Sequence, residues 1–428
     1  MNEFIKQHIA DDVQKLRLKY CSDRNLSEAE RRAYSDAILQ IECRRKYSSK
    51  FPSLLSEDDF RFPDSLSAEQ ASHEWVAAYH ASLVGDAKSL VDITSGLGID
   101  FIFMSRSVAL NGGGSLAVDM DPAKVDCLRS NAALAGLDSF TVLYGESMSC
   151  LNSIVSGECD FELPFSLPAD ILFVDPARRG EGDRRLYDPA QCSPDIISNA
   201  DLVFNVARRE IIKNSPMLDL HEALRIFRGV EEIHVVSVRN ECKEVLVIVS
   251  PEGRFSKVRC VNIMSESEWS VVDVSADSFS NPVPAPFIAD MDSFADMISS
   301  DSPAYLYEPN ASIMKAGVAS AISMSYTSDS ADEESQLYKL SANCHLFIGK
   351  VLLPDYPGRI IRIDGLIDKK MKKSLKGNSF NVVSRNYPQK ADAIASALKV
   401  KPSDINYIYG VTVGKKSTPA LLYGASVG

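Results

Sequence analysis

The sequence predicts an α/β protein in which a parallel β-sheet with helices on both faces follows a helical region and precedes small α+β domains. Three observations lead to this fold class. Short apolar runs alternate with helical patterns from residue 89 onward, and the first run passes straight into a helix through two glycines. Two later apolar runs, at 233–238 and 245–249, predict an antiparallel hairpin that closes the sheet.

Length and composition predict several globular domains. The chain of 428 residues exceeds the roughly 250–300 residues at which one hydrophobic core stops growing. Its 45% hydrophobic and 24% charged residues are ordinary globular values and exclude disorder as a global description. Changes of pattern predict a helical region over 1–85, the α/β domain over 86–275, a small α+β domain over 276–350 and a basic domain over 351–428.

The region 1–85 is expected to form three helices. Apolar residues recur at helical spacing from residue 4 to residue 20. A second helix begins at Ser27, where Glu30 completes a capping box, and reaches about residue 46. Ser67 and Gln70 are expected to cap a third helix in the same way.

Apolar runs and turn residues predict the later elements. In the α/β domain we expect strands at 90–94, 115–119, 141–144, 171–175 and 210–213, and helices that begin at 99, at 122 and near 148, with another at 218–227. Prolines at 281–287 mark a boundary, and a helix follows at 312–323. The basic domain is expected to hold strands at 359–363, 379–383 and 407–413 and a helix at 390–398.

The sequence shows no sign of export, membrane insertion or metal binding. No run approaches the roughly 18 apolar residues of a membrane span, and charges interrupt residues 1–20, where a signal peptide needs an apolar block. The nine cysteines are scattered and never form a C-x-x-C pair, which predicts free thiols in a reducing cytoplasm and no zinc site. We therefore expect a cytoplasmic protein with no metal and no membrane partner.

A strand-to-helix turn is the most informative motif. Residues 91–100 read Val-Asp-Ile-Thr-Ser-Gly-Leu-Gly-Ile-Asp, so a strand enters a helix through Gly96 and Gly98. Glycine at such a turn permits unusual dihedrals and close approach of a ligand. A dinucleotide site would add a third glycine, whereas Asp92 places a carboxylate where a diphosphate would lie. This carboxylate repels phosphate and suits an amino-acid moiety that bears an ammonium group.

Acidic residues also follow the next two strands. Asp119-Met120 ends the second strand, where a carboxylate can accept hydrogen bonds from both hydroxyls of a ribose. Glu146-Ser147 follows the third strand, where a carboxylate can accept from an adenine amino group. Three carboxylates at successive strand ends predict S-adenosylmethionine as the cofactor. In the competing interpretation, which the two glycines alone would favour, the acids cap helices or bind another nucleotide.

With these motifs in order from Val91 to Arg179, the sequence resembles the class I S-adenosylmethionine-dependent methyltransferases, which implies a Rossmann-like sheet. The first of the family's three loop glycines is replaced here by a threonine, whose hydroxyl can take over its backbone role. The run at 94–100 also resembles that of a bacterial ribosomal-RNA guanine methyltransferase. The expected cofactor-binding residues are Asp92, Thr94, Gly96, Gly98, Asp119, Met120, Glu146 and Ser147.

The fourth strand ends in Asp175-Pro176-Ala177-Arg178, beside the expected position of the sulfonium methyl group. In amino-group methyltransferases the acid here is followed by Pro-Pro and an aromatic residue that stacks on the base. We expect Asp175 to orient the nucleophile or take its proton, with Pro176 and Arg178 beside it, because alignment supplies most of the catalysis. Ala177 and Arg178 depart from the pattern, which leaves open a protein that binds cofactor and RNA without turnover.

The Asp-Pro-Ala-Arg run is more similar to the Asp-Pro-Pro-Arg of RNA uracil-C5 methyltransferases. Those enzymes also need a nucleophilic cysteine followed by Asn-Pro, which this chain lacks at the corresponding place. The nearest candidate is Cys242, which we expect to be a buried thiol rather than a nucleophile. A uracil substrate is therefore the weaker interpretation.

Positive charge is concentrated in the last domain. Residues 356–428 hold thirteen Lys and Arg against four Asp, a net +9, which leaves −21 for residues 1–355 of a chain whose net charge is −12. Such a surface binds a polyanion by releasing its counterions. The arginines of the loop next to Asp175 suit phosphate or a stacked base, with a loop ion-pair network as the alternative. The expected nucleic-acid-binding residues are Arg179, Arg184, Lys369, Lys370, Lys372, Lys373 and Lys376.

Over nearly its whole length the chain is similar to a bacterial family of class I methyltransferases that end in a THUMP-like domain. The similarity includes residues 40–50, 69–79, 215–219 and 307–310, and the terminus from residue 357. It implies a ferredoxin-like domain over 276–350, a THUMP-like domain over 351–428 and an RNA substrate, tRNA or rRNA. A small-molecule or protein methyltransferase is the alternative, because this fold serves many substrates.

Overall fold

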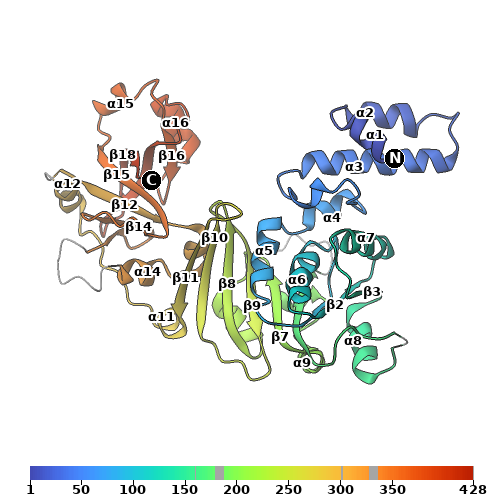
Figure 1. Ribbon diagram of the computed structural model, residues 1–428. Helices are drawn as coiled ribbons and strands as arrows, with labels where there is room; N and C mark the ends of the chain where they lie inside the picture. The colour runs from blue at the N-terminus through green and yellow to red at the C-terminus, as the bar shows by residue number, and fades with distance from the viewer. Residues whose placement is uncertain (160, 179–187, 300–301, 327–335, 428) are drawn as a thin grey trace. The chain divides into compact units, whose positions relative to one another are not determined.

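The structure is a computed structural model that describes residues 1–159, 161–178, 188–299, 302–326 and 336–427 (Figure 1). The chain forms two compact units. The first comprises Met1–Ile233 and Glu244–Phe255, and the second comprises His234–Lys243 and Ser256–Gly428. Two of the residues expected to bind nucleic acid, Arg179 and Arg184, lie outside the described residues.

The N-terminal region is helical, as expected. The capping box of Ser27 and Glu30 is confirmed at the start of α3. The single helix expected at 4–20 is instead two helices, because the Asp12 side chain accepts two backbone N–H groups and starts a new helix. The helices are α1 (Asn2–His8), α2 (Val13–Leu16), α3 (Glu28–Lys46), α4 (Ser65–Gln70) and α5 (Glu74–Ser82), with a π-helical turn at Arg17–Cys21 and a 3-10 turn at Leu54–Ser56.

The capping box predicted at Ser67 and Gln70 is wrong. Ser67 instead donates its backbone N–H to Asp64 Oδ1 at 2.7 Å, so Asp64 is the N-cap of α4. The His73 side chain caps a separate helix, α5. A short turn over 71–73 therefore interrupts the helix that the pattern predicts.

The first unit contains the expected parallel sheet. Its strand order is β9-β7-β4-β1-β2-β3, in which only β9 runs antiparallel to its neighbour β7. All of β1 and most of β4 are buried, as is typical of parallel strands covered on both faces. The strands are β1 (Ser89–Asp92), β2 (Gly114–Asp119), β3 (Phe140–Tyr144), β4 (Ala169–Val174), β7 (Ala207–Asn214) and β9 (Glu241–Val249).

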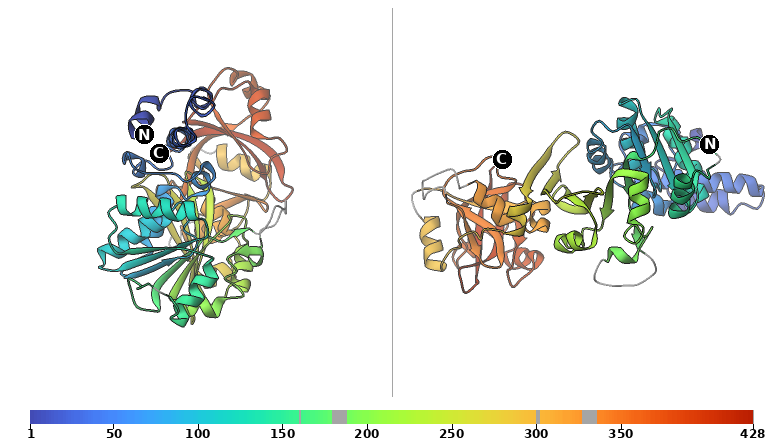
Figure 2. Two further views of the ribbon diagram at one scale, coloured as in Figure 1. Left: turned by 90° about the vertical axis from the view of Figure 1, so that its right-hand side faces the viewer. Right: turned by 90° about the horizontal axis from the view of Figure 1, so that it is seen from below.

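Helices lie on both faces of this sheet (Figure 2). Contacts pair α5 with α6 and α8 with α9. A separate two-stranded sheet is formed by β5 (Ala177–Arg178) and β6 (Cys192–Ser193), and a 3-10 turn at Pro189–Gln191 directly precedes β6. The helices are α6 (Ile99–Leu110), α7 (Pro122–Leu134), α8 (Ser147–Ser156), α9 (Ala200–Val206) and α10 (Leu220–Ile226).

The predicted hairpin is present between β8 (Val230–Val238) and β9. Its turn falls at Arg239 and Asn240, whose φ angles of 48° and 64° suit a two-residue hairpin loop. The sequence does not predict β10 (Lys257–Ile263) and β11 (Trp269–Ser275), because serines and charges interrupt their apolar residues. These two strands pair antiparallel, and the strand order in the second unit is β11-β10-β8.

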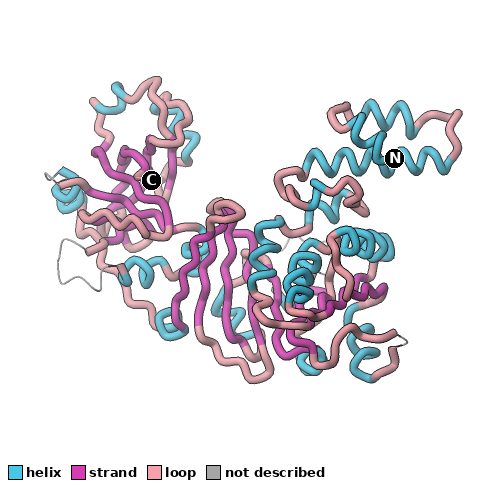
Figure 3. The backbone as a smooth tube through the Cα atoms, in the orientation of Figure 1, coloured by secondary structure: helices cyan, strands magenta, loops and turns pink. Residues whose placement is uncertain are grey.

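A seven-stranded sheet occupies the rest of the second unit (Figure 3). Its order is β13-β14-β12-β15-β18-β17-β16. Because β12 pairs with β15, the segments 276–350 and 351–428, expected to be separate domains, contribute strands to one sheet. The strands are β12 (Ala304–Pro309), β13 (Tyr338–Ser341), β14 (Cys344–Gly349), β15 (Gly358–Leu366), β16 (Asn381–Ser384), β17 (Asn406–Val413) and β18 (Thr418–Ser426).

The helices of the second unit are short. The helix expected at 312–323 is divided, because Gly317, with φ of 73°, ends α13. Among the described residues, no helix has both the length and the apolar character to cross a membrane. The helices are α11 (Ala276–Ser280), α12 (Met291–Ser299), α13 (Ala311–Ala316), α14 (Ala319–Ser325), α15 (Met371–Ser374) and α16 (Ala391–Leu398).

The Tyr-Glu-Pro-Asn run at 307–310 has a structural role. Glu308 is only 3% exposed, and its carboxylate accepts hydrogen bonds from Tyr409 Oη at 2.6 Å, Arg359 Nη1 at 3.0 Å and Arg385 Nε at 2.8 Å. A carboxylate this buried requires charged or hydrogen-bonded partners. The cluster therefore ties β12 to β15 and β17.

Candidate functional site

A cleft of about 630 Å³ lies at the carboxyl ends of β1, β2, β3, β4 and β7 in the first unit. This is where parallel α/β sheets bind their ligands, and the volume is ordinary for a cofactor site. The turn between α4 and α5 forms another part of its wall. The lining includes Asp92, Thr94, Gly96, Gly98, Asp119, Met120, Glu146, Ser147 and Asp175.

The loop after β1 is fixed by its own side chains. Thr94 donates its backbone N–H to Asp92 Oδ1 at 2.9 Å, and its hydroxyl accepts from the backbone N–H of Asp175 at 2.7 Å. Thr94 thus ties the loop to the end of β4. A Cβ on Gly98, whose φ is 86°, would lie 2.1 Å from Leu128 Cδ1, so this position requires glycine for both conformation and packing.

Asp92 is the most deeply buried acid of the cleft, at 1% exposure. Burial raises the pKa of its carboxyl well above the ordinary value, the Thr94 N–H opposes this, and the nearby acids Asp100, Asp119 and Asp175 raise the pKa further. A bound cation would favour the ionised form.

The acids after β2 and β3 accept backbone hydrogen bonds. Asp119 accepts from Gly96 N at 2.8 Å on Oδ2 and from Asp121 N at 2.9 Å on Oδ1, which leaves further lone pairs on both oxygens. Glu146 caps α8 through the backbone N–H groups of its first turn. Ser147 donates its hydroxyl to the Ile93 carbonyl at 2.7 Å. Both acids thus have structural hydrogen bonds in addition to their place in the cleft.

The three residues expected to be catalytic, Asp175, Pro176 and Arg178, have different surroundings in the structure. Asp175 lines the cleft with its side chain 42% exposed. Pro176 is buried, and the Arg178 backbone pairs with Cys192 in the β5–β6 sheet. Cys242, expected to be a buried thiol, is partly exposed at the start of β9, in the part of that strand that belongs to the second unit.

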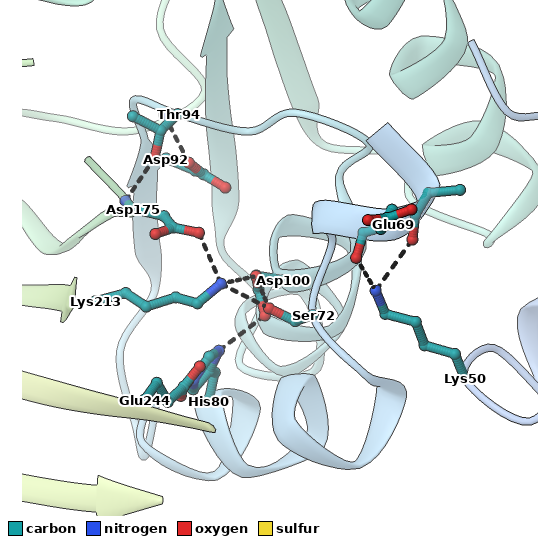
Figure 4. Close-up of polar contacts among 11 residues, drawn as sticks. Lys50, Glu69, Ser72, His80, Asp92, Thr94, Asp100, Asp175, Lys213 and Glu244 are labelled. Carbon is teal, nitrogen blue, oxygen red and sulfur yellow. Dashed lines mark hydrogen bonds and ion pairs between the residues drawn. The ribbon is translucent and has the colours of Figure 1, made fainter. Parts of the chain in front are cut away.

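A lysine whose side chain is only 13% exposed contacts Asp175 (Figure 4). Lys213, near the end of β7, donates to Asp175 Oδ2 at 2.7 Å and to Ser72 Oγ at 3.0 Å, and its Nζ lies 4.0 Å from Asp100 Oδ2. Ser72 in turn donates to Asp100 Oδ2 at 2.6 Å. The α4–α5 turn is therefore bonded directly to the charged wall of the cleft.

The network continues into the core. His80 is fully buried, with Nδ1 at 2.8 Å from Asp100 Oδ1 and Nε2 at 2.5 Å from Glu244 Oε1. Both ring nitrogens donate only when the imidazole is protonated. Glu244, His80, Asp100, Lys213 and Asp175 then form a row of alternating charges with one net negative charge.

In His80, Asp100, Lys213 and Asp175, neighbouring charges of opposite sign oppose the effect of burial on the pKa. Burial alone would lower the pKa of His80, but Glu244 and Asp100 more than offset it and raise the pKa to about 10. Burial would raise the pKa of Asp100, but His80 and Lys213 lower it to about 2. Burial would lower the pKa of Lys213, and the surrounding acids raise it. For Asp175, burial raises the pKa and Lys213 opposes that rise.

Sequence reasoning did not find His80, Glu244 or Ser72. Asp100 follows the glycine turn, but its partner His80 precedes it in the helical region, and Glu244 is 164 residues from His80. No local pattern reports such a separation. The one available signal is a histidine in the mostly apolar α5, whereas Glu244 follows Glu241 and Lys243 at the polar start of β9 and does not stand out.

The five expected nucleic-acid-binding lysines lie in the second unit, around α15. All are exposed, and within the described residues none forms an ion pair: Lys369, Lys370, Lys372, Lys373 and Lys376. The aromatic side chains of β17, in contrast, are buried in the core. Groups of three or more His, Cys, Asp or Glu able to hold a metal are absent from the described part of the chain.

Comparisons with known proteins show the fold. A family model for a ferredoxin-like domain matches residues 305–357, and no curated protein matches the chain. A crystal structure of a "putative methyltransferase" from Porphyromonas gingivalis W83 is 22% identical, covers 100% of this chain and 97% of that chain, and has a TM-score of 0.79. An O-methyltransferase from Bacillus cereus in complex with SAH is 16% identical over 41% of this chain and 80% of that chain, with a TM-score of 0.31. The first likeness confirms the predicted Rossmann-like fold class.

Proposed function

We propose that the protein is an S-adenosylmethionine-dependent methyltransferase that methylates a base nitrogen, exocyclic or in the ring, of structured RNA, either tRNA or rRNA. The observation that carries the proposal is the convergence of Asp92, Asp119 and Glu146, from three successive strand ends, on one cleft that also contains Asp175. The similarity of fold to a protein named as a methyltransferase supports it.

The charge of the cleft suits this cofactor. The row from Glu244 to Asp175 has one net negative charge, and Asp92 and Asp119 add acidic groups, whereas S-adenosylmethionine has an ammonium and a sulfonium group. We assign the ammonium to Asp92 and the ribose hydroxyls to the remaining lone pairs of Asp119. Gly96 and Gly98 leave the loop backbone open to the ligand. We assign the adenine to Met120, Glu146 and Ser147, which line the same cleft.

Asp175 is the residue that we assign to the acceptor nitrogen. When bound, the cofactor supplies a methyl group on a sulfonium, which a nitrogen lone pair can displace as the C–S bond breaks. Thr94 holds the backbone of Asp175, so its carboxylate presents a fixed acceptor at the substrate side of the cleft. This carboxylate accepts a hydrogen bond from the acceptor N–H and draws off its proton.

The basic residues support RNA as the substrate. The five lysines around α15 are exposed and free of ion pairs within the described residues, in a segment of net charge +9. Such groups bind phosphates with an affinity that falls steeply with salt. We accordingly propose that residues 351–428 act as a THUMP-like, RNA-binding part of the chain.

Mass spectrometry of nucleosides tests the substrate directly. RNA from cells with and without the gene should differ in one methylated base, and the purified protein should restore it in vitro with S-adenosylmethionine. Asp175→Asn should lower this activity about 10²–10⁴-fold, whereas Asp138→Asn, at an exposed position, should leave it unchanged. Methylation of a small molecule or protein with unaltered RNA would refute the RNA substrate.

Filter binding at several salt concentrations tests the RNA contact separately. Replacing the five lysines by glutamine should weaken binding and reduce the slope of log affinity against log salt by about 0.7–0.9 for each phosphate that is no longer neutralised. Lys15→Gln and Lys88→Gln, exposed positions in the first unit, serve as controls. Salt-independent binding by the unmodified chain would exclude the proposed RNA-binding surface.

A further inference from the structure

The environment of Lys213 has a feature that cofactor binding alone does not require. Its side chain is only 13% exposed, although an unpaired lysine at such a depth would lose its charge. Acids from three different elements face it: Asp175 after β4, Asp100 on α6 and Glu244 on β9. The surrounding acids therefore keep Lys213 charged, and its ammonium group contacts the Asp175 carboxylate in the cleft.

We propose that Lys213 is a positioning residue that holds the Asp175 carboxylate ionised and in one orientation, and that Asp100, His80 and Glu244 brace Lys213 for this purpose. The inference rests on the proposed function for its use, but the pairing itself does not depend on it.

Two hydrogen bonds define the orientation of Asp175. Its backbone N–H is bound to Thr94 Oγ1 at 2.7 Å, and its Oδ2 accepts from Lys213 at 2.7 Å. Within the described residues, Oδ1 has no hydrogen-bond partner, and the side chain is 42% exposed. One oxygen is thus fixed by the lysine, and we assign the substrate N–H to the other, which no described residue contacts by a hydrogen bond.

The bracing is carried by hydrogen bonds on the opposite side of the lysine. Ser72 accepts from Lys213 and donates to Asp100, so the ammonium group cannot swing away from Asp175 without breaking its hydrogen bonds to both Asp175 and Ser72. His80, held between Asp100 and Glu244, supplies the second positive charge that makes Asp100 a stable anion. The whole row lies within the first unit.

Removal of Lys213 changes the sum of charges around the Asp175 carboxyl. The groups that face this carboxyl are then Asp100, Glu244 and the neighbouring Asp92, all acids, and His80 lies behind Asp100. Removal of the cation therefore raises the pKa of Asp175. A neutral carboxyl donates a hydrogen bond where an amine substrate needs an acceptor.

Carbodiimide labelling with an amine, read by peptide mass spectrometry, measures the state of Asp175 without cofactor or turnover. In Lys213→Met, the pH at which Asp175 labelling falls by half should rise by about 1 unit or more relative to the unmodified protein. The exposed Asp138 is the internal control in each sample. Lys88→Met is the matched control, because residue 88 precedes β1 and the cleft lies at the other end of that strand. It should leave the labelling midpoints of both Asp175 and Asp138 unchanged.

A second variant keeps the test decisive if Lys213→Met does not fold. Lys213→Met combined with Asp100→Asn removes one charge of each sign and should show a smaller rise for Asp175, because an acid that raises its pKa is removed together with the cation. In either folded variant, kcat should fall at neutral pH. The pH below which kcat declines should rise together with the midpoint of Asp175 labelling. KM for RNA should stay within about threefold of the value for the unmodified protein. Unchanged labelling and an unchanged acid limb in a folded variant overturn the proposal. If the unmodified chain binds no S-adenosylmethionine, the proposed function fails instead, and the labelling result still stands.

Discussion

Replacement of His80 by glutamine should destabilise the protein in a pH-dependent way. His80 is fully buried between two carboxylates, and removal of one partner from such a buried cluster costs about 3–5 kcal/mol. The rise of its pKa from 6.5 to about 10 corresponds to at most about 5 kcal/mol of stability. Because the folded pKa is raised, this contribution is complete below pH 6.5 and is lost as pH rises through about 10.

Urea unfolding at pH 6, 7.5 and 9 measures the effect. Trp75 lies on α5 with His80, so its fluorescence in a Trp269→Phe background reports on this region. The difference in unfolding free energy between the background protein and His80→Gln should shrink by about 1.4 kcal/mol per pH unit above pH 6.5. His221→Gln, at an exposed position of α10, should change stability by no more than about 0.5 kcal/mol. A difference that stays constant with pH would refute an imidazolium at position 80.

Three further predictions concern single positions. Burial raises the pKa of Glu210 to about 8, so stability should fall as pH rises from 4.5 to 8, by up to about 1.4 kcal/mol per unit, and urea titrations of Glu210→Gln should lack this loss. Gly98→Ala should destabilise by about 1–3 kcal/mol more than Gly136→Ala in thermal unfolding, since both have positive φ but only the first meets Leu128; equal losses would contradict this. Calorimetry should find that S-adenosylmethionine binds more tightly as pH rises, because the pKa of Asp92 is raised by burial and its carboxyl must ionise to hold the ammonium group, and Asp92→Asn should remove that trend.

The parallel sheet and the cleft acids could be predicted because their signals are local. β1, β2, β3 and β4 are continuous apolar runs, and Asp92 and Asp119 stand directly at strand ends, where the topology of the sheet brings them together. The same reasoning located Asp175 at the end of β4.

The network behind Asp175 could not be predicted because it depends on distant residues. His80 meets Glu244 only after the chain has formed the sheet, and nothing near either residue in the sequence indicates the other. The prediction of a single helix where α4 and α5 stand failed because the start of a helix depends on which side chain caps it. Asp64 and Ser67 are both residue types that cap helices, and the pattern alone does not decide at which of them the helix begins.

Isothermal titration calorimetry of the unmodified protein with S-adenosylmethionine is the most direct test of the central claim, which is that acids from separate strands form one adenosyl cofactor site. One molecule should bind per chain, and Asp119→Asn should weaken binding at least about tenfold through the loss of hydroxyl hydrogen bonds to a charged group. The absence of binding heat, or an Asp119→Asn variant that binds as tightly as the unmodified chain, would contradict the account.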